Sequence, residues 1–408
     1  MSDELRILHQ IVLRNGAWGG MEKHFAAFVR DGQKRSGVSN FLVENLRRVA
    51  PEVGAALACL SQPARELRRW HGLPVPKWPV AARQVHRASL ARRWDINCVL
   101  NWNLVGDPAP ARLAERRRGL SVYWERGAAW YESAPDFDPA FVDAYGLYLA
   151  NSEASRQMLL QRWGVRGEVQ VCAPGVVFGG GPGAMARSPP EGRAVRLGFA
   201  ARLRGFKGGV LAVHAIAELA RRGIDAELWV AGEGKDGTRM SAEALRLGIA
   251  ERVRMLGRVS PMEPFLDSID LLLHPALREP YGLACAEALA AGAPVVATAV
   301  DGLGEVVEHG VTGLCVEPTL PLSRYAEFGG DAGDVYPMVY RPQSGTIGEP
   351  MLPDPAALAD AVAIIMDADR YTAMSTAALQ AHRGRLAFER KQEHLYELLR
   401  AALGKVAA

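Results

Sequence analysis

Short β-type apolar runs alternate with helical patterns along almost the whole chain, and this alternation limits the fold more than any other feature. In the second half it is regular between residues 195 and 298. In the first half a helix is predicted over residues 21–34, and the predicted strands are residues 6–13, 97–100, 120–124, 147–151 and 168–172. Strands that alternate with helices indicate parallel sheets covered by helices, so the predicted fold class is α/β.

A stretch rich in Gly and Pro interrupts the pattern at residues 179–193, and its lack of apolar periodicity is typical of a linker. With 408 residues, the chain also exceeds the usual size of one hydrophobic core. We therefore predict a Rossmann-like domain over residues 1–178, a linker over 179–194, and a second Rossmann-like domain over 195–386. Residues 319–351 show neither period and predict a long loop or lid inserted in the second domain.

Charge and cysteine usage exclude several classes of protein. The net charge of +3 gives no nucleic-acid signature. The five cysteines form no CxxC motif, which favours a reducing compartment. The first residues are too charged for a signal peptide, and no apolar run approaches the roughly 18 residues of a membrane-spanning helix. These features predict a cytoplasmic protein, and they leave its oligomeric state open.

The most informative segment is residues 269–298, which predicts strand, loop, helix and strand. Glu279 and Glu287 flank the start of the helix, where Pro280 suits the first helical position. Free backbone amides at such a helix start bind phosphate groups, and the two carboxylates could accept hydrogen bonds from sugar hydroxyls. The amides expected there are those of Tyr281, Gly282 and Leu283. In the alternative interpretation Glu279 only complements the helix dipole and Glu287 is a solvated helix residue.

Two cations follow the first strand of the second domain. Arg202 and Lys207 lie in a Gly-containing turn between strand and helix, where both would face the crevice at the strand ends. Arginine can hold a phosphate with two hydrogen bonds, and lysine adds a point charge. Taken alone, basic residues in a loop are more often simply solvated.

Glycine-containing loops could complete a donor pocket. Gly232 follows one predicted strand, and Arg258 and Val259 follow another. In the N-terminal domain, Gly19 and Gly20 open the first helix but do not fit the GxGxxG fingerprint of dinucleotide-binding proteins.

An acceptor-side candidate in the N-terminal domain is the pair Glu125 and Arg126, which follows a predicted strand. Trp124, Trp130 and Tyr131 lie beside it, and aromatic faces next to polar groups suit a carbohydrate. Clusters of this kind are, however, more often ordinary packing.

The combined motifs closely resemble those of the family 4 glycosyltransferases, retaining enzymes of the GT-B fold. The resemblance is strong over residues 195–318 and faint before residue 145. It rests on five segments: ARLRGFKG at 201–208, AGEG at 231–234, LGRVS at 256–260, an E-x7-E motif at 279–287, and DGLGEVVEHGVTGLCVEP at 301–318. GGME at residues 19–22 also resembles the N-terminal loop of that family.

The resemblance implies two Rossmann-like domains facing a central cleft, with the C-terminal helix, residues 387–408, packing back on the N-terminal domain. It implies that Arg202 and Lys207 contact the donor diphosphate, that Glu279 approaches the donor sugar, and that Glu287 holds the ribose hydroxyls. A UDP- or GDP-sugar would be the donor, and no separate cofactor or metal is expected.

The chain also departs from the family pattern. Glu125 and Arg126 stand where many relatives carry a histidine, and PGVV at residues 174–177 replaces the usual NGVD. The resemblance favours a glycan or lipid-linked acceptor in cell-envelope synthesis, such as that of lipopolysaccharide. Two alternatives stay open: a catalytically silent sugar-nucleotide-binding protein, and a phosphorylase or epimerase of the same fold.

A basic segment could place the protein peripherally on an anionic membrane. It combines cations with tryptophans, which favour the boundary between water and lipid. Its members are Arg65, Arg68, Arg69, Lys77, Arg83, Arg87, Arg92 and Arg93, with Trp70, Trp78 and Trp94 interleaved. The alternative is a solvated basic face with the tryptophans packed inward.

Overall fold

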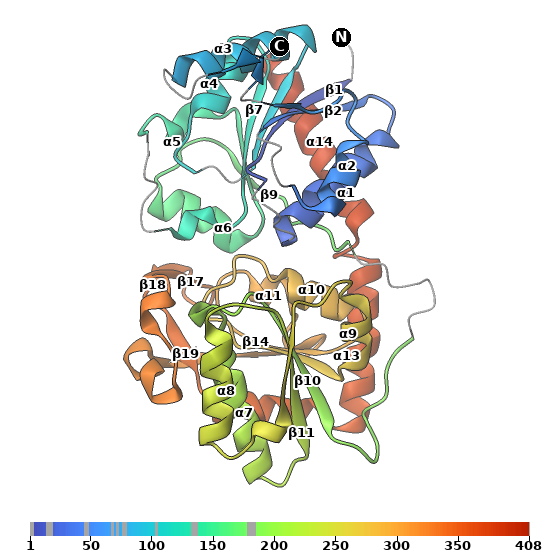
Figure 1. Ribbon diagram of the computed structural model, residues 1–408, viewed down its shortest axis with the longest axis vertical. Coiled ribbons are helices and arrows are strands. Elements are labelled where there is room, and N and C mark those ends of the chain that lie inside the picture. Colours follow the sequence, from blue (N-terminus) through green and yellow to red (C-terminus); the bar gives the residue numbers. More distant parts are fainter. Residues whose placement is uncertain are drawn as a thin grey trace. The chain divides into compact units, whose positions relative to one another are not determined.

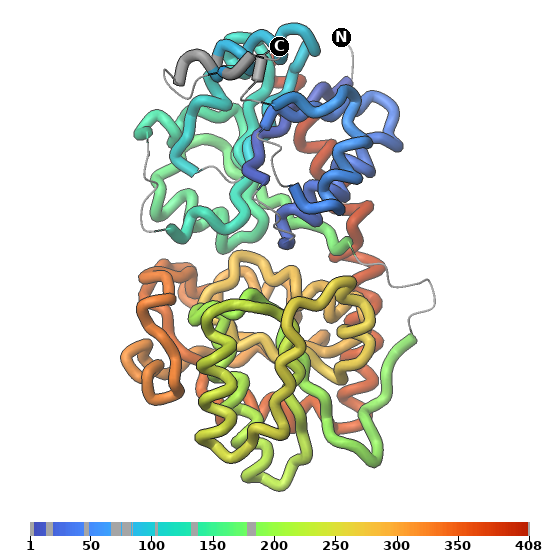
Figure 2. Tube along the Cα trace, in the orientation of Figure 1, coloured from blue at the N-terminus to red at the C-terminus, as the bar shows by residue number. Residues whose placement is uncertain are grey.

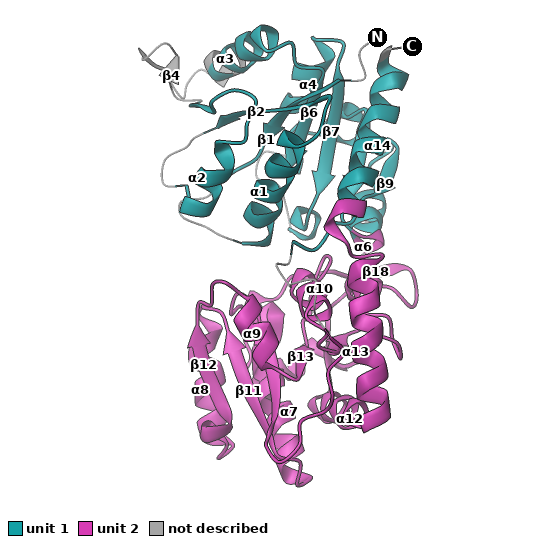
Figure 3. Cartoon of the chain, turned by 90° about the vertical axis from the view of Figure 1, so that its right-hand side faces the viewer, with its two compact units in different colours: residues 1–151, 155–177, 391–408 teal, residues 152–154, 178–390 magenta. Residues whose placement is uncertain are grey.

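The computed structural model describes residues 4–13, 19–44, 49–66, 69–70, 73–75, 80–102, 105–131, 138–177 and 185–407. The chain divides into two compact units, each shown in its own colour in Figure 3. The N-terminal unit comprises Met1–Asn151, Ser155–Val177 and Lys391–Ala408, and the C-terminal unit comprises Ser152–Ala154 and Phe178–Arg390. Each unit contains its own parallel sheet, so the predicted α/β class with two Rossmann-like domains is confirmed.

The sheet of the N-terminal unit has the strand order β3-β2-β1-β6-β7-β8-β9, and every neighbouring pair is parallel (Figure 1). The strands are β1 (Leu5–Gln10), β2 (Val38–Glu44), β3 (Arg65–Glu66), β6 (Cys98–Trp102), β7 (Leu120–Glu125), β8 (Leu147–Ala150) and β9 (Val169–Val171). The sequence did not predict β2, because Ser39 and Asn40 interrupt its apolar run. Asn40 is nevertheless buried, since it pairs with a buried histidine of β1.

Helices cover both faces of this first sheet. On one face, α1 (Gly20–Gln33), α2 (Pro51–Leu57) and the C-terminal helix α14 (Phe388–Ala407) share an apolar core with the strands. Phe28 of α1 and Tyr396 of α14 pack with ring centroids 5.5 Å apart, so the expected return of the C-terminal helix is confirmed. On the other face lie α3 (Val80–Arg93) and α4 (Ala109–Glu115). Two shorter helices, α5 (Phe141–Ala144) and α6 (Glu153–Gln157), flank β8 along the chain.

The second sheet has the order β12-β11-β10-β13-β14-β15, which is the 3-2-1-4-5-6 order of a Rossmann fold. Its strands are β10 (Val195–Ala200), β11 (Ala226–Ala231), β12 (Val253–Gly257), β13 (Leu271–His274), β14 (Val295–Thr298) and β15 (Gly313–Val316). Strand order reverses between β10 and β13, which pair in parallel. This reversal leaves a crevice at the carboxyl ends of those two strands.

Helices also sort onto the two faces of the second sheet. α7 (Gly209–Arg221) packs against α8 (Asp236–Arg246) and α12 (Pro355–Ile365), while α10 (Leu283–Ala290) packs against α13 (Ala368–Arg383). Gly198 of β10 faces α9 (Glu263–Ser268), because a Cβ there would meet Phe265. Figure 2 follows the chain through both units and shows the undescribed residues in grey. The predicted linker, residues 179–194, lies outside the described residues up to residue 184.

The insertion in the second unit, predicted as a long loop or lid over residues 319–351, contains short strands and 3₁₀ turns that the sequence did not predict. β16 (Pro318–Pro321) pairs antiparallel with β19 (Met351–Pro353), so the two ends of the insertion are joined. Within the insertion, β17 (Val339–Arg341) forms a hairpin with β18 (Thr346–Gly348). The 3₁₀ turns η5 (Leu322–Phe328) and η6 (Ala332–Asp334) lie between β16 and β17. Few apolar residues alternate here because the strands are only three or four residues long.

A neutral histidine is built into the core of the first unit. His9 of β1 is fully buried, with Nε2 2.9 Å from Asn40 Oδ1 and with Nδ1 accepting a 3.0 Å hydrogen bond from Trp102 Nε1. Burial lowers the pKa of His9 to about 4, and the hydrogen bond with Asn40 offsets this only in part.

This lowered pKa predicts that the first unit loses stability in mild acid. Above pH 6.5 His9 is neutral whether folded or unfolded, but between pH 6.5 and about 4 only the unfolded chain takes up the proton. The free energy of unfolding should therefore fall by roughly 1.4 kcal/mol per pH unit from this residue, or about 3 kcal/mol in all. Denaturant titrations followed by tryptophan fluorescence would report on this unit, which holds eight of the nine tryptophans.

The matched variant is His9→Gln, whose amide can make both hydrogen bonds but takes up no proton. Its stability should fall less steeply than that of the wild type between pH 6.5 and 5. The exposed His394, replaced in the same way, serves as the control. Equal slopes for wild type and His9→Gln would contradict the assignment.

Candidate functional site

The predicted donor residues gather at one edge of the second sheet. Because all six strands are parallel, the loops after β10, β11, β12, β13 and β14 leave from the same carboxyl edge. Lys207 comes from the loop after β10 and Glu279 from the loop after β13, the two strands at which the order reverses. In open α/β sheets this reversal point is where ligands bind.

Lys207 and Glu279 form an ion pair at this point. Lys207 Nζ lies 2.5 Å from Glu279 Oε2, and the side chains of the two residues are only 13% and 14% exposed. His274, the last residue of β13, places Nε2 3.1 Å from the same oxygen and is 1% exposed. Glu279 Oε1 accepts no hydrogen bond from the described residues, so the second oxygen is available to a ligand.

The surroundings of Glu279 keep its carboxylate ionised. Burial acts to raise the pKa of Glu279, but the charge of Lys207 and the hydrogen bond from His274 outweigh it and hold the pKa well below its usual range. An ionised carboxylate can only accept hydrogen bonds. Glu279 is therefore suited to receive a hydroxyl of a bound sugar rather than to donate a proton.

Gly232 allows three neighbouring loops to meet. Its φ of +147° is a conformation that side chains rarely adopt, and a Cβ there would lie 1.8 Å from the carbonyl oxygen of Ala201. Its amide donates a 2.7 Å hydrogen bond to the carbonyl of Gly257, at the end of β12. The residue thereby links the loops that follow β10, β11 and β12 at the carboxyl edge.

The helix after Glu279 begins later than the sequence predicted. α10 starts at Leu283, and Gly282 precedes it with a left-handed φ of +102°, so Pro280 does not occupy the first helical position. The first-turn amides are consequently those of Leu283, Ala284 and Cys285 rather than those of Tyr281 and Gly282. Gly282 must lack a Cβ because that atom would lie 2.8 Å from Leu303 Cδ2. An N-terminal turn with free amides still faces the carboxyl edge, as the phosphate-binding hypothesis requires.

The remaining donor candidates lie on this same edge. Arg202 is exposed just after β10 and makes no ion pair with the described residues, so its guanidinium can meet an anion. Arg258 is exposed and Val259 half-buried directly after β12. Glu287 is half-buried about one turn into α10.

In the N-terminal unit the candidates follow β1 and β7, at the carboxyl edge of the first sheet. Gly19 and Gly20 are exposed at the start of α1, where the amide of Gly19 donates a 3.1 Å hydrogen bond to Glu22 Oε2. Arg126 is half-buried, and its guanidinium stacks over Trp124 at 4.8 Å and reaches His24 Nδ1 at 2.8 Å. Burial and the charge of Arg126 lower the pKa of His24 well below its usual value, so His24 is a neutral acceptor.

Glu125 has a different environment from that expected of a ligand-binding residue. It is fully buried; Oε2 accepts a 2.5 Å hydrogen bond from Tyr123, and Oε1 accepts from the amides of Gly127 and Ala129. These bonds fix the turn that follows β7. Of the two acceptor-side candidates, only Arg126 presents part of its side chain to solvent.

Two residues at the site were not predicted. His274 ends the apolar run of β13 and Asp301 follows β14, so each is a polar residue at a strand end, a signal that could have found them. Asp301 is 2% exposed, and its Oδ2 accepts a 2.9 Å hydrogen bond from the backbone amide of Glu279. In the ranges that the structure describes, no three His, Cys, Asp or Glu side chains are arranged to hold a metal ion.

Comparison with known proteins agrees with this geometry. Residues 194–326 match the family described as Glycosyl transferases group 1. An uncharacterized glycosyltransferase of Methanocaldococcus jannaschii is 34% identical over 125 residues, which are 30% of this chain and 32% of that protein. The D-inositol 3-phosphate glycosyltransferase of Corynebacterium efficiens is 37% identical over 127 residues, 29% of this chain and 30% of that enzyme. The matched stretch thus spans about a third of these relatives' length.

Solved structures resemble the chain over nearly its full length. A glycosyltransferase from Rickettsia africae aligns with a TM-score of 0.72 and 15% identity, over 98% of this chain and 99% of that one. Anabaena HepE in complex with UDP-glucose gives 0.67 and 17%, over 98% and 100%. WaaG, a glycosyltransferase involved in lipopolysaccharide biosynthesis, gives 0.59 and 14%, over 97% and 99%. These likenesses show the fold.

The chain therefore has the GT-B fold, and its segment 194–326 matches the group 1 glycosyltransferases. This stretch contains Arg202, Lys207, Glu279 and Glu287, the four residues on which the predicted donor site rests.

The close approach at Gly232 predicts a large loss of stability in Gly232→Ala. Backbone strain and overlap with Ala201 should together cost roughly 2–5 kcal/mol of unfolding free energy. Gly223→Ala is the matched control, because φ at Gly223 is also positive, +76°, but a Cβ there meets nothing within 4 Å. That control should cost only about 1–2 kcal/mol. Denaturant titration would measure both, and equal losses would contradict the proposed loop packing.

Proposed function

We propose that this chain is a retaining glycosyltransferase that moves a hexose-type sugar from a nucleoside diphosphate donor to a glycan or lipid-linked acceptor. The observation that carries the proposal is the Lys207–Glu279 ion pair at the strand-order reversal of a group 1 glycosyltransferase segment. It places a fixed cation for a diphosphate beside an ionised acceptor of hydrogen bonds for a sugar.

The chemistry would depend on stabilising the departing diphosphate. As the bond between the sugar C1 and the phosphate oxygen breaks, negative charge grows on that oxygen. Lys207, Arg202 and the amides of Leu283 and Ala284 can oppose this charge without reorganising. The acceptor oxygen bonds to C1, and its proton passes to the leaving diphosphate. Glu279 would orient the sugar through Oε1, and Glu287 would hold the ribose hydroxyls.

The donor class is the best supported part of the substrate assignment. Anabaena HepE, which has this fold, was solved with UDP-glucose, and this supports a UDP-sugar; a GDP-sugar remains the other candidate. For the acceptor, the fold shared with WaaG supports a lipopolysaccharide or another envelope glycan. Arg126, beside two tryptophans and His24, is the residue we assign to the acceptor side.

Two alternatives predict different products. A silent binding protein would bind nucleoside diphosphates but would neither hydrolyse nor transfer the sugar. A phosphorylase would need inorganic phosphate, and an epimerase would return an altered sugar nucleotide. Incubation with UDP- and GDP-sugars, followed by chromatography of the nucleotides and sugars, separates the three.

Loss of either charge should abolish most turnover. We expect Lys207→Ala and Glu279→Gln each to lower kcat by about a hundredfold or more, since one such charge-stabilising group typically contributes on the order of 3 kcal/mol to catalysis. Release of nucleoside diphosphate from the donor would be the measurement, with circular dichroism to verify folding. Lys405→Ala is the control, because Lys405 is an exposed lysine of α14 in the N-terminal unit. Near-normal turnover in a folded Lys207 or Glu279 variant would remove these residues from the mechanism.

We also propose that no divalent metal is required, because Lys207 and Arg202 supply the positive charge that a metal would otherwise bring to the diphosphate. Turnover should be unchanged, within about twofold, after treatment with EDTA. Activity that disappears with EDTA and returns with magnesium or manganese would overturn this.

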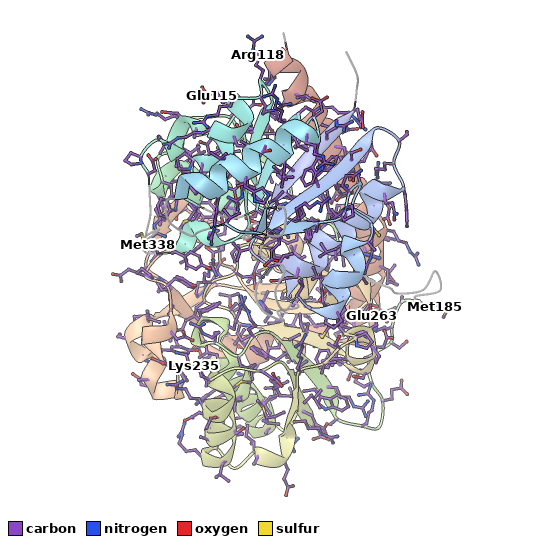
Figure 4. All side chains as sticks on the ribbon, turned by 45° about the horizontal axis from the view of Figure 1, so that its top comes forward. Glu115, Arg118, Met185, Lys235, Glu263 and Met338 are labelled. Atoms are coloured by element: carbon purple, nitrogen blue, oxygen red, sulfur yellow. The ribbon has the colours of Figure 1, made fainter. Side chains whose placement is uncertain are left out.

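Peripheral contact with an anionic membrane also remains a proposal. Arg92 and Arg93 are exposed at the end of α3, and Arg118 stands out beyond α4 beside Glu115 (Figure 4). Trp94 is 7% exposed and stacks on Phe41, so it is not available to a lipid surface. Arg68, Lys77 and Trp78 lie outside the described residues, as do the side chains of Arg69 and Trp70.

The described part of the chain holds no helix with the length and apolar character needed to span a bilayer. Sedimentation with vesicles of graded anionic lipid content tests the peripheral contact. We expect binding that rises with anionic lipid and falls with salt, because each cation near such a surface contributes about 1 kcal/mol. In an Arg92→Ala/Arg93→Ala variant that binding should weaken. Absence of binding at low salt, or binding that ignores lipid charge, would leave a soluble acceptor.

A further inference from the structure

The insertion between β15 and α12 contacts both loops that carry the ion pair of the donor site. Three residues from its middle make these contacts. Asp334 contacts the loop after β10, and Tyr336 contacts the loop after β13. Tyr340 contacts Asp301, which in turn binds the backbone of Glu279. The three residues extend from the last residue of η6, Asp334, to the middle of β17, Tyr340.

The first contact fixes the loop of Lys207. Asp334 is 6% exposed; it accepts a 2.7 Å hydrogen bond from the amide of Gly205 and pairs with the guanidinium of Arg204. Lys235, labelled in Figure 4, lies 3.3 Å from the same carboxylate. Burial acts to raise the pKa of Asp334, but the hydrogen bonds from Arg204 and Gly205 lower it to about 2. The ionised Asp334 thus holds the backbone at Gly205, two residues before Lys207.

The second contact joins both loops to the insertion. The guanidinium of Arg278 lies 4.6 Å from the ring centre of Tyr336 and 5.7 Å from that of Phe206. The ring centroids of Phe206 and Tyr336 are 5.3 Å apart, with an angle of 62° between the ring planes. Phe206 immediately precedes Lys207 and Arg278 immediately precedes Glu279, so one cluster holds the neighbours of both charged residues.

The third contact reaches Glu279 through Asp301. Asp301 Oδ1 accepts a 2.7 Å hydrogen bond from the amide of Tyr340, and Oδ2 accepts a 2.9 Å bond from the amide of Glu279. The amide of Asp301 in turn donates to the Tyr340 carbonyl at 3.0 Å. Asp301 has a φ of +48°, a strained conformation for a residue other than glycine. Strain at a buried residue persists only where the surrounding contacts demand that conformation.

We propose that the insertion acts as a clamp that positions Glu279 against Lys207, and that Asp301 is the positioning residue through which it acts. The inference rests on the proposed function, since it assigns the insertion to the donor-sugar part of that site. Catalytic geometry must be held to about 0.5 Å by supporting contacts, and a misplacement of 1 Å can cost a hundredfold in rate. The insertion supplies such support to the Glu279 backbone, which otherwise follows a short strand into an irregular loop.

The test replaces Asp301 with Gly and with Asn. Asp301→Gly removes both acceptors and relieves the positive φ, while Asp301→Asn keeps the conformation and one acceptor oxygen. We expect kcat to fall about ten- to a hundredfold in Asp301→Gly and by less in Asp301→Asn. The dissociation constant for UDP or GDP, measured calorimetrically, should stay within threefold, because the diphosphate contacts come from Lys207 and α10. Glu327→Ala, an exposed change in the same insertion, is the control.

Hydrogen exchange on the ligand-free protein gives a readout that does not depend on activity. The peptide covering residues 275–283 should exchange faster in Asp301→Gly than in wild type or Glu327→Ala. Unchanged kcat in folded Asp301→Gly overturns the proposal, as does unchanged exchange in this peptide. If the wild-type protein neither transfers the sugar nor hydrolyses the donor, the proposed function fails. Faster exchange in Asp301→Gly would then still support the clamp.

Discussion

The ion pair between Lys207 and Glu279 is the interaction around which the candidate site of the second unit is arranged. Two charges taken out of water are tolerated only where good geometry and additional hydrogen bonds compensate for their lost hydration. Here His274 adds a second donor to Glu279 Oε2, and the backbone of Glu279 is held by Asp301. The pair fixes the sign and the place of both charges before any ligand arrives, which is the condition for electrostatic catalysis.

Sheet topology explains why these two residues meet although 72 positions separate them. β10 and β13 are neighbours only because the chain first adds β11 and β12 on one side and then returns to the other. The glycine contacts at the carboxyl edge, such as that of Gly232 with Ala201, let the neighbouring loops pack beside this pair. The insertion contacts the loops of Lys207 and Glu279 through Asp334 and Tyr336.

Much of the fold follows from the sequence because apolar periodicity is strong wherever an element packs against the core. The regular alternation over residues 195–298 predicted the second parallel sheet, and Arg202, Lys207, Glu279 and Gly232 do lie at one edge of it. β2 was missed because the polar Asn40 is satisfied by His9 in the core, a pairing that no local pattern reveals. Local sequence patterns likewise do not reveal other contacts between residues far apart in the chain.

The start of α10 and the role of Glu125 show two further limits of sequence reasoning. Pro280 is compatible with a first helical turn, but the left-handed Gly282 delays the helix, and that choice depends on the packing of Leu303. Glu125 follows a strand end as a ligand-binding residue would, yet its oxygens serve the turn after β7. The sequence predicts a loop for the insertion because its strands are only three or four residues long, too short to show a period.

A crystal structure determined after soaking with UDP or with GDP would show whether the Lys207–Glu279 site binds a diphosphate. We expect density for the diphosphate with its oxygens about 3 Å from Lys207 Nζ and from the first amides of α10. We also expect the nucleoside to lie toward the loops after β11 and β12. Diphosphate density elsewhere, with the Lys207–Glu279 site left empty at saturating nucleotide, would contradict this expectation.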